Sequence, residues 1–168
     1  MPRETELENT LVLIKPDGVK RQLIGEIITR FEKVGLKIVA MKMVQPTREM
    51  ASEHYDEKIA KAHGEDIRKN LIEFLTSGPV VALLIHGTSA IAQVRKMIGT
   101  TEPANSPPGT IRGDFCHINY AGADSQNKAI ENVIHASDSK ESALREWNIW
   151  LENRDCCCYN TVHQIHTL

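Results

Sequence analysis

The segment Asn132–Ser139 places one histidine beside two hydroxyl groups and a carboxylate, a combination that could perform nucleophilic catalysis. His135 ends a short apolar run, and Ser137, Asp138 and Ser139 follow it closely. An imidazole with an unperturbed pKa is largely neutral at pH 7, and neutral imidazole is a nucleophile. A histidine at the end of an apolar strand is more often structural, so this segment alone leaves both interpretations open.

A long segment rich in Pro, Gly, Thr, Ser and Asn, residues 99–114, could bind a polyphosphate. It contains Thr101 and Arg112, and Arg95 precedes it on a predicted helix. Guanidinium groups bind phosphate oxygens through paired hydrogen bonds, and Lys15 could add a further positive charge. Arg112 could instead form an ion pair within the loop, and Lys15 could be an ordinary lysine at a strand end. No P-loop or dinucleotide-binding glycine motif occurs in the sequence.

Length and composition are those of an ordinary globular domain. The 168 residues are 41% apolar and 25% charged, which suits one domain with one substantial core. The net charge of −2 gives no reason to expect nucleic-acid or membrane binding. Residues 1–9 lack the apolar core of a signal peptide, and no later run has the roughly 20 apolar residues of a membrane span. We therefore expect a cytoplasmic protein with reduced cysteines.

Apolar periodicity predicts four strands, at residues 10–14, 36–44, 80–85 and 133–135. It predicts helices at 23–34, from Thr47 to Tyr55, at 66–75, at 89–97, and from a cap at Ser137 or Ser139 to 150 or 151. Residues 56–65 are interpreted as a loop or a single helical turn, and 99–114 and 119–128 as loops. This order favours an α/β (α+β) ferredoxin-like sandwich, in which helices cover a four-stranded antiparallel sheet. We expect one domain at 1–152 and an irregular C-terminal tail at 153–168.

The sequence resembles nucleoside diphosphate kinases in motifs that run in order from about Asn9 to Leu151. These motifs are Ile14–Val19, His54–Tyr55, Ser77–Val80, Gly99–Ala104, Pro108–Phe115 and Asn132–Ser139. The motifs Pro-Gly-Thr-Ile-Arg-Gly-Asp-Phe and Asn-Val-Ile-His-Ala-Ser-Asp are too long and specific to be a chance match. The resemblance implies a ferredoxin-like enzyme that moves the terminal phosphoryl group of a nucleoside triphosphate to a nucleoside diphosphate. It also implies ping-pong kinetics, Mg²⁺ bound with the nucleotide, and a homo-oligomer of four or six subunits.

By motif position, the resemblance implies that His135 is the nucleophile that becomes a phosphohistidine. Glu146 matches the carboxylate that orients this histidine, and Ser137 matches the neighbouring hydroxyl. Lys15 matches the lysine near the transferred phosphoryl group, and Tyr55 matches the phenol beside that lysine. These five residues are the expected catalytic group.

The resemblance also implies a nucleotide-binding group, which consists of Lys15, Ile67, Arg95, Thr101, Arg112 and Asn132. Arg95, Thr101 and Arg112 match phosphate ligands, so removing the Arg112 side chain should slow transfer far more than it destabilises the domain. Asp138 matches a residue near the magnesium ion. Ile67 lies nearest to the position of the family's base-stacking phenylalanine. Two segments, 55–77 and 115–132, are longer here than in many members.

Three other interpretations remain open from the sequence. The chain could be a family member that keeps the fold but works as a binding or regulatory module. It could be an RNA-binding ferredoxin-like domain, although aromatic residues make up only 5% of the chain. The tail could bind a soft metal through Cys156–Cys158, His163 and His166, although adjacent cysteines lack the usual chelating spacing.

Overall fold

Four antiparallel strands form the central sheet of the computed structural model, which describes residues 7–162 and residue 164. They are β1 (Leu7–Ile14), β2 (Lys37–Val44), β3 (Val80–Thr88) and β4 (Ile134–Ala136), in the order β2-β3-β1-β4. β1 pairs with β3 and with β4, and β2 pairs with β3. This confirms the predicted four-stranded antiparallel sheet and the ferredoxin-like class.

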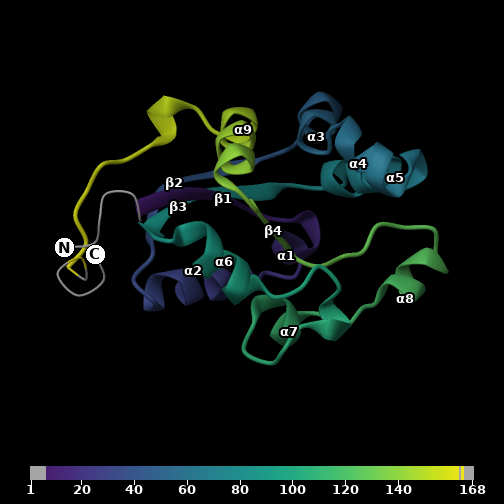
Figure 1. Cartoon of the computed structure of the whole chain (residues 1–168), viewed down its shortest axis with the longest axis horizontal. Coiled ribbons are helices and arrows are strands. Elements are labelled where there is room, and N and C mark those ends of the chain that lie inside the picture. Colours follow the sequence, from purple (N-terminus) through teal and green to yellow (C-terminus); the bar gives the residue numbers. More distant parts are fainter. Residues whose placement is uncertain (1–6, 163, 165–168) are drawn as a thin grey trace.

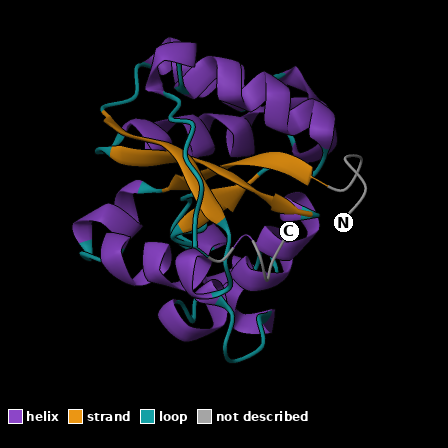
Figure 2. Cartoon of the chain, turned by 90° about the vertical axis from the view of Figure 1, so that its left-hand side faces the viewer, coloured by secondary structure: helices purple, strands orange, loops and turns teal. Residues whose placement is uncertain are grey.

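Helices cover both faces of this sheet (Figures 1 and 2). The helices are α1 (Pro16–Lys20), α2 (Ile24–Lys33), α3 (Arg48–His54), α4 (Glu57–His63), α5 (Glu65–Thr76), α6 (Ala90–Ile98), α7 (Ile111–Phe115), α8 (Tyr120–Asp124) and α9 (Lys140–Trp150). Two short 3₁₀ turns, η2 (Pro103–Asn105) and η3 (Asn153–Asp155), complete the described elements. In Figure 1, α3, α4, α5 and α9 lie above the sheet, and α2, α6 and α7 lie below it.

β1 is buried on both faces because each of its faces supplies one hydrophobic core. Val12 and Ile14 pack with residues of α2 and α6 on one side of the sheet. Leu11 and Leu13 pack with residues of α3, α5 and α9 on the other side. All four side chains are fully buried, as the continuous apolar run in the sequence predicts. β1 is therefore held by both cores, and β4 pairs with it while helices pack on its two faces.

Three segments that the sequence analysis interpreted as loops contain helices. Residues 57–63 form α4, which has no buried residue and begins at a cap where Asp56 accepts a hydrogen bond from Lys58 N. The prediction of a loop or a single helical turn at 56–65 was wrong because a helix with no fully buried side chain needs no marked apolar period. The 99–114 segment contains η2 and the start of α7, and the 119–128 segment contains α8, which Asn119 caps.

The described part of the tail lies along β2, the edge strand (Figure 1). Cys157 N donates a hydrogen bond of 2.7 Å to Val39 O, and Tyr159 Oη donates one of 2.7 Å to Ile38 O. The division at residue 152 remains a prediction. Of the residues suggested for a soft-metal site, Cys156–Cys158 are free thiols, and His163 and His166 lie outside the described residues.

None of the helices within residues 7–162 is long and apolar enough to cross a membrane.

Phe31 and Val34 provide a matched pair for testing which side of α2 stabilises the fold. Phe31 is fully buried, whereas Val34, directly after the helix, is 55% exposed. We expect Phe31→Ala to lower the free energy of unfolding by about 3–5 kcal/mol, because it leaves a cavity in the core. We expect Val34→Ala to change it by less than about 0.5 kcal/mol. Urea denaturation measures both values, and similar losses for the two variants would contradict this packing.

Candidate active site

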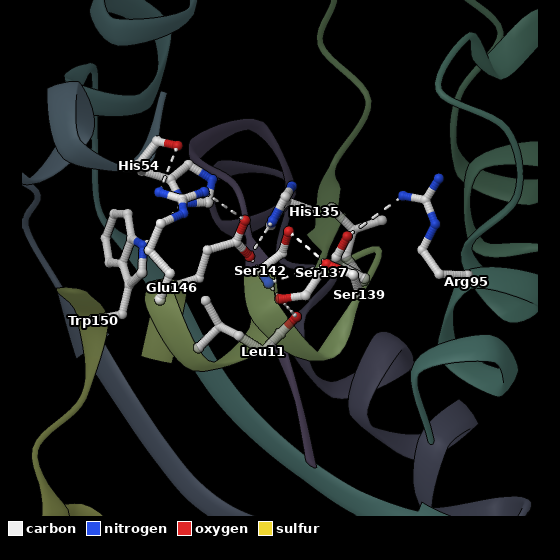
Figure 3. Close-up of polar contacts among 12 residues, drawn as sticks. Leu11, His54, Arg95, His135, Ser137, Ser139, Ser142, Glu146 and Trp150 are labelled. Carbon is white, nitrogen blue, oxygen red and sulfur yellow. Dashed lines mark hydrogen bonds and ion pairs between the residues drawn. The ribbon is translucent and has the colours of Figure 1, made fainter. Parts of the chain in front are cut away.

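His135, on β4, forms a short hydrogen-bonded chain with Glu146 on α9 (Figure 3). His135 Nε2 lies 2.8 Å from Glu146 Oε2, and Ser137 Oγ donates to the same carboxylate oxygen over 2.6 Å. In neutral imidazole, the proton that Glu146 accepts must be on Nε2, so the free electron pair is on Nδ1. Nδ1 of His135 makes no hydrogen bond to any described residue. The geometry therefore presents Nδ1 as the nucleophilic nitrogen.

Glu146 is a buried carboxylate that the surrounding groups keep ionised. Burial raises its pKa, but the hydrogen bonds from His135 and Ser137, together with the nearby His135 and His54 rings, outweigh burial and lower the pKa to about 2. Arg145 lies 3.3 Å from the second carboxylate oxygen. An ionised carboxylate fixes the tautomer of an imidazole and increases the basicity of its other nitrogen.

His54 is the residue at this site to which the sequence analysis gave no role. Its ring is buried and meets the His135 ring edge to face, with 4.5 Å between ring centroids. Burial and the nearby His135 lower the pKa of His54 well below its usual value, so His54 is neutral. Trp150 Nε1 donates to His54 Nδ1 over 3.3 Å, which places the His54 proton on Nε2. The motif His54–Tyr55 was visible in the sequence, but its contact with His135 was not.

His54, His135 and Glu146 are close enough to suggest a metal site, because their ligand atoms lie within 4.8 Å of one another. One ligand atom of each residue already takes part in a hydrogen bond, between His135 Nε2 and Glu146 Oε2 and from Trp150 to His54 Nδ1. Magnesium also prefers oxygen ligands over imidazole. This cluster therefore does not fit Mg²⁺.

A cleft of about 530 Å³ opens beside His135, between α4 and α9. The predicted site residues among those that line it are Tyr55, Arg95, Thr101, His135, Asp138 and Glu146. The other lining residues are His54, Asp56, Lys58, Ile59, His63, Ala136, Glu141, Ser142 and Arg145. The structure thus brings residues that are up to 92 positions apart in sequence (His54 to Glu146) to one cavity.

Arg112 has the surroundings of a structural arginine. It is 3% exposed, and its guanidinium donates to the carbonyl oxygens of Gly99, Thr100, Asn132 and Ile134 over 2.6–3.3 Å. These bonds join the 99–110 loop to the chain that enters β4. Burial and the neighbouring Arg95 lower its pKa to about 10, so it remains a cation at neutral pH. Four of the five guanidinium N–H groups of Arg112 therefore donate hydrogen bonds within the protein.

Lys15 and Asn132 also lie behind the cleft and not among the residues that line it. Lys15 Nζ donates to Asn132 Oδ1 over 2.8 Å, and Asn132 Nδ2 donates to Thr101 O over 2.8 Å. Burial, with a smaller contribution from Arg112, lowers the pKa of Lys15 to about 8. Lys15 is therefore a desolvated ammonium connected to the wall of the cleft through one amide side chain.

Tyr55 and Ile67 have different relations to the cleft. Tyr55 lines it and is buried, and burial raises the pKa of its phenol, so the hydroxyl keeps its proton and can donate. Arg68, on α5, fixes the end of α3 next to Tyr55 by donating to Tyr55 O and to Ser52 Oγ, both over 2.7 Å. Ile67 is 47% exposed on α5 and is not among the lining residues. The apolar and aromatic side chains that α4 adds to the cleft are Ile59 and His63.

Asp138 fits a magnesium ion that is held mainly by phosphates. It lines the cleft, and hydrogen bonding with Ser142 outweighs its partial burial and lowers its pKa. One carboxylate together with substrate phosphates is a usual environment for protein-bound Mg²⁺. The donor atoms at this position therefore suit the expected cation, in contrast to the histidine cluster.

Arg112→Lys tests the structural function that the sequence analysis did not give to Arg112. One ammonium group cannot reach all four carbonyls, and each buried carbonyl left without a partner costs about 1–3 kcal/mol. We expect a loss of at least about 2 kcal/mol in the free energy of unfolding, together with slower turnover. Arg95→Lys is the control, because Arg95 makes one 3.4 Å bond to Ala136 O and should change stability by less than about 1 kcal/mol. Equal stability of the two variants would contradict a structural role for the four hydrogen bonds of Arg112.

Comparisons with known proteins identify the family to which the chain belongs. The family profile described as nucleoside diphosphate kinase matches residues 8–156. Nucleoside diphosphate kinases of Saccharolobus islandicus and Pyrococcus abyssi are 50% and 51% identical, over 89% and 93% of this chain and 98% and 91% of theirs. A structure of the Borrelia burgdorferi enzyme, described as a transition-state mimic with vanadate and ADP, matches with a TM-score of 0.95 at 39% identity over 98% of each chain. A Pyrobaculum aerophilum NDP kinase matches with a TM-score of 0.83 at 36% identity, over 89% of this chain and 98% of its own. The chain is therefore a phosphotransferase that belongs to the nucleoside diphosphate kinase family.

Proposed function

We propose that this enzyme transfers the phosphoryl group in two steps through a phosphohistidine at Nδ1 of His135. The observation that carries this proposal is the hydrogen bond between His135 Nε2 and Glu146, which leaves Nδ1 as the nitrogen with a free electron pair. In the first step, Nδ1 forms a bond to the γ-phosphorus, and the bond from that phosphorus to the bridging oxygen breaks. The nucleoside diphosphate leaves with the electron pair, and a second one later accepts the phosphoryl group by the reverse step.

The positive groups around the cleft support this transfer because phosphoryl transfer requires positioning and charge neutralisation. Arg95 and Thr101 line the cleft and are the proposed phosphate ligands, and Tyr55 is the proposed hydroxyl donor to the transferred group. Lys15 and Arg112 contribute positive charge from behind the cleft wall, and Asn132 connects Lys15 to Thr101. Ser137 keeps Glu146 directed at His135.

Magnesium bound with the nucleotide would neutralise charge on the phosphate oxygens, and Asp138 is the residue proposed to lie near it. For the base, Ile67 remains the counterpart expected from sequence position, and Ile59 and His63 are nearer candidates because they line the cleft. We propose nucleoside di- and triphosphates as the substrates.

We also propose that the enzyme is a cytoplasmic homo-oligomer, a tetramer or a hexamer, that binds neither nucleic acid nor membranes. The exposed side chains of Met41 and Met43 on the edge strand β2 support self-association, because a second subunit could cover them. The small net charge supports the expected absence of nucleic-acid and membrane binding.

A labelling experiment tests the phosphohistidine. With γ-labelled ATP and Mg²⁺, we expect a label on the protein that is labile in acid, stable in alkali, and discharged by adding GDP. His135→Asn should remove the label. His86→Asn is the control, because His86 lies on β3 and pairs with Asn9 outside the cleft, so its label should match that of the unmodified chain. A label that persists in His135→Asn would rule out this nucleophile.

The pH dependence tests the function of Lys15. Because burial lowers its pKa from 10.5 to about 8, the free enzyme loses this positive charge as the pH rises through about 8. We therefore expect kcat/KM to fall above about pH 8, since kcat/KM reports on the free enzyme. Bound phosphates stabilise the ammonium, so kcat should persist to higher pH. Steady-state rates between pH 6.5 and 9.5 measure both, and a flat kcat/KM profile would show that transfer does not need a charged Lys15.

A further inference from the structure

Val133, two residues before His135, adopts a backbone conformation that a β-branched residue rarely takes. Its φ angle is +56°, in the left-handed region. Ile134 N donates to Asn132 O over 2.7 Å, which closes a three-residue turn around Val133. Turns of this kind with a positive central φ are the rare, strained class. Strained backbone persists only where its surroundings hold it in place.

Lys15, directly after β1, and Asp17, in α1, bind both backbone polar groups of Val133. Asp17 Oδ2 accepts a hydrogen bond from Val133 N over 2.9 Å, and Lys15 N donates one to Val133 O over 2.8 Å. Val133 is fully buried, and Asp17 is buried as well. The conformation of Val133 therefore depends on two groups that are more than 100 residues away in sequence.

Gly18 permits this close approach. A Cβ atom added at Gly18 would lie 2.9 Å from Val133 O and 2.9 Å from Ile14 Cγ2, closer than such atoms pack. The need for glycine at this position is therefore steric and arises from Val133 O and the Ile14 side chain together.

The buried carboxylate of Asp17 faces the positive charge of Lys15 and the backbone N–H of Val133. Its Oδ1 atom is buried and makes no hydrogen bond within residues 7–162. Asp17 is also not among the residues that line the cleft. Burying a carboxylate oxygen without a partner costs free energy. The hydrogen bond that Val133 N donates to the other oxygen offsets part of this cost.

We infer that Asp17 is a positioning residue for His135, which it orients by holding Val133 in the left-handed conformation. β4 has three residues, and its pairing with β1 places His135 opposite Leu13. The turn at Val133 sets the direction in which this short strand begins. If Val133 relaxed to a negative φ, the rotation would carry His135 away from Glu146. Asp17 thus acts on the nucleophile through the backbone and touches no substrate.

This inference rests on the proposed phosphohistidine function, and single-turnover labelling tests it. We expect Asp17→Ala to slow labelling of His135 by about tenfold or more, because small misplacements of reacting groups have effects of this size. The affinity for nucleotide should change less than about twofold, because Asp17 lies outside the cleft. Asp17→Asn should restore most of the rate, since its amide oxygen can still accept from Val133 N.

Asp155→Ala is the matched control. Asp155 also accepts a backbone hydrogen bond, from Glu152 N over 2.8 Å, but it lies in the tail. This variant should label at the rate of the unmodified chain. A rate for Asp17→Ala equal to that of the unmodified chain, or a rate for Asp17→Asn as slow as that of Asp17→Ala, would overturn the inference.

Two further measurements complete the test. If Asp17→Ala does not fold, Gly18→Ala takes its place, because it displaces Val133 O while keeping the carboxylate, and it should slow the same step. The ¹⁵N resonances of His135 should show a proton on Nε2 in the unmodified chain and a mixture of tautomers in the slow variants. An unchanged tautomer in a slow variant would overturn the inference. Absence of label on the unmodified chain would contradict the proposed function instead, and the tautomer measurement would then decide the positioning of His135 by itself.

Discussion

The hydrogen bond between His135 and Glu146 is the contact on which the other features of the site depend. His135 comes from a three-residue strand and Glu146 from a helix on one face of the sheet, so the bond forms only if β4 and α9 hold fixed positions. Both are attached to β1, which pairs with β4 and packs against α9. Because β1 is buried on both faces, it cannot shift without disturbing two cores.

Behind the cleft, buried polar groups hold the chain around the nucleophile in place. Arg112 joins the loop after Gly99 to the entry of β4, and Lys15 is tied to Asn132. Desolvated cations are costly unless hydrogen bonds compensate, and here backbone carbonyls and an amide provide the compensation. The same groups therefore stabilise the fold and create a positive potential where phosphates are expected to bind.

The sequence predicted the elements that bury apolar residues and the residues that belong to long motifs. The run at Thr10–Ile14 and the spacing of Ile27 and Phe31 have physical signatures, because burial imposes a period. α4 has no such signature, since none of its residues is fully buried. The hydrogen bonds of Arg112 to carbonyl groups also have no signature in the sequence. Every residue carries a carbonyl, and only the folded chain determines which carbonyls lie next to the guanidinium. For the same reason the contact of His54 with His135 was not predictable.

The helix α4, which forms one wall of the cleft, differs from its neighbours in how it is attached. Its residues are all at least partly exposed, whereas Arg68 fastens the end of α3 to α5 on either side of it. Segments with few buried contacts open at low free-energy cost, far below that of global unfolding. We therefore expect α4 to open locally at a lower free-energy cost than α3 and α5, which Arg68 joins. Local opening of this wall of the cleft would leave β4 and α9, which carry His135 and Glu146, in place.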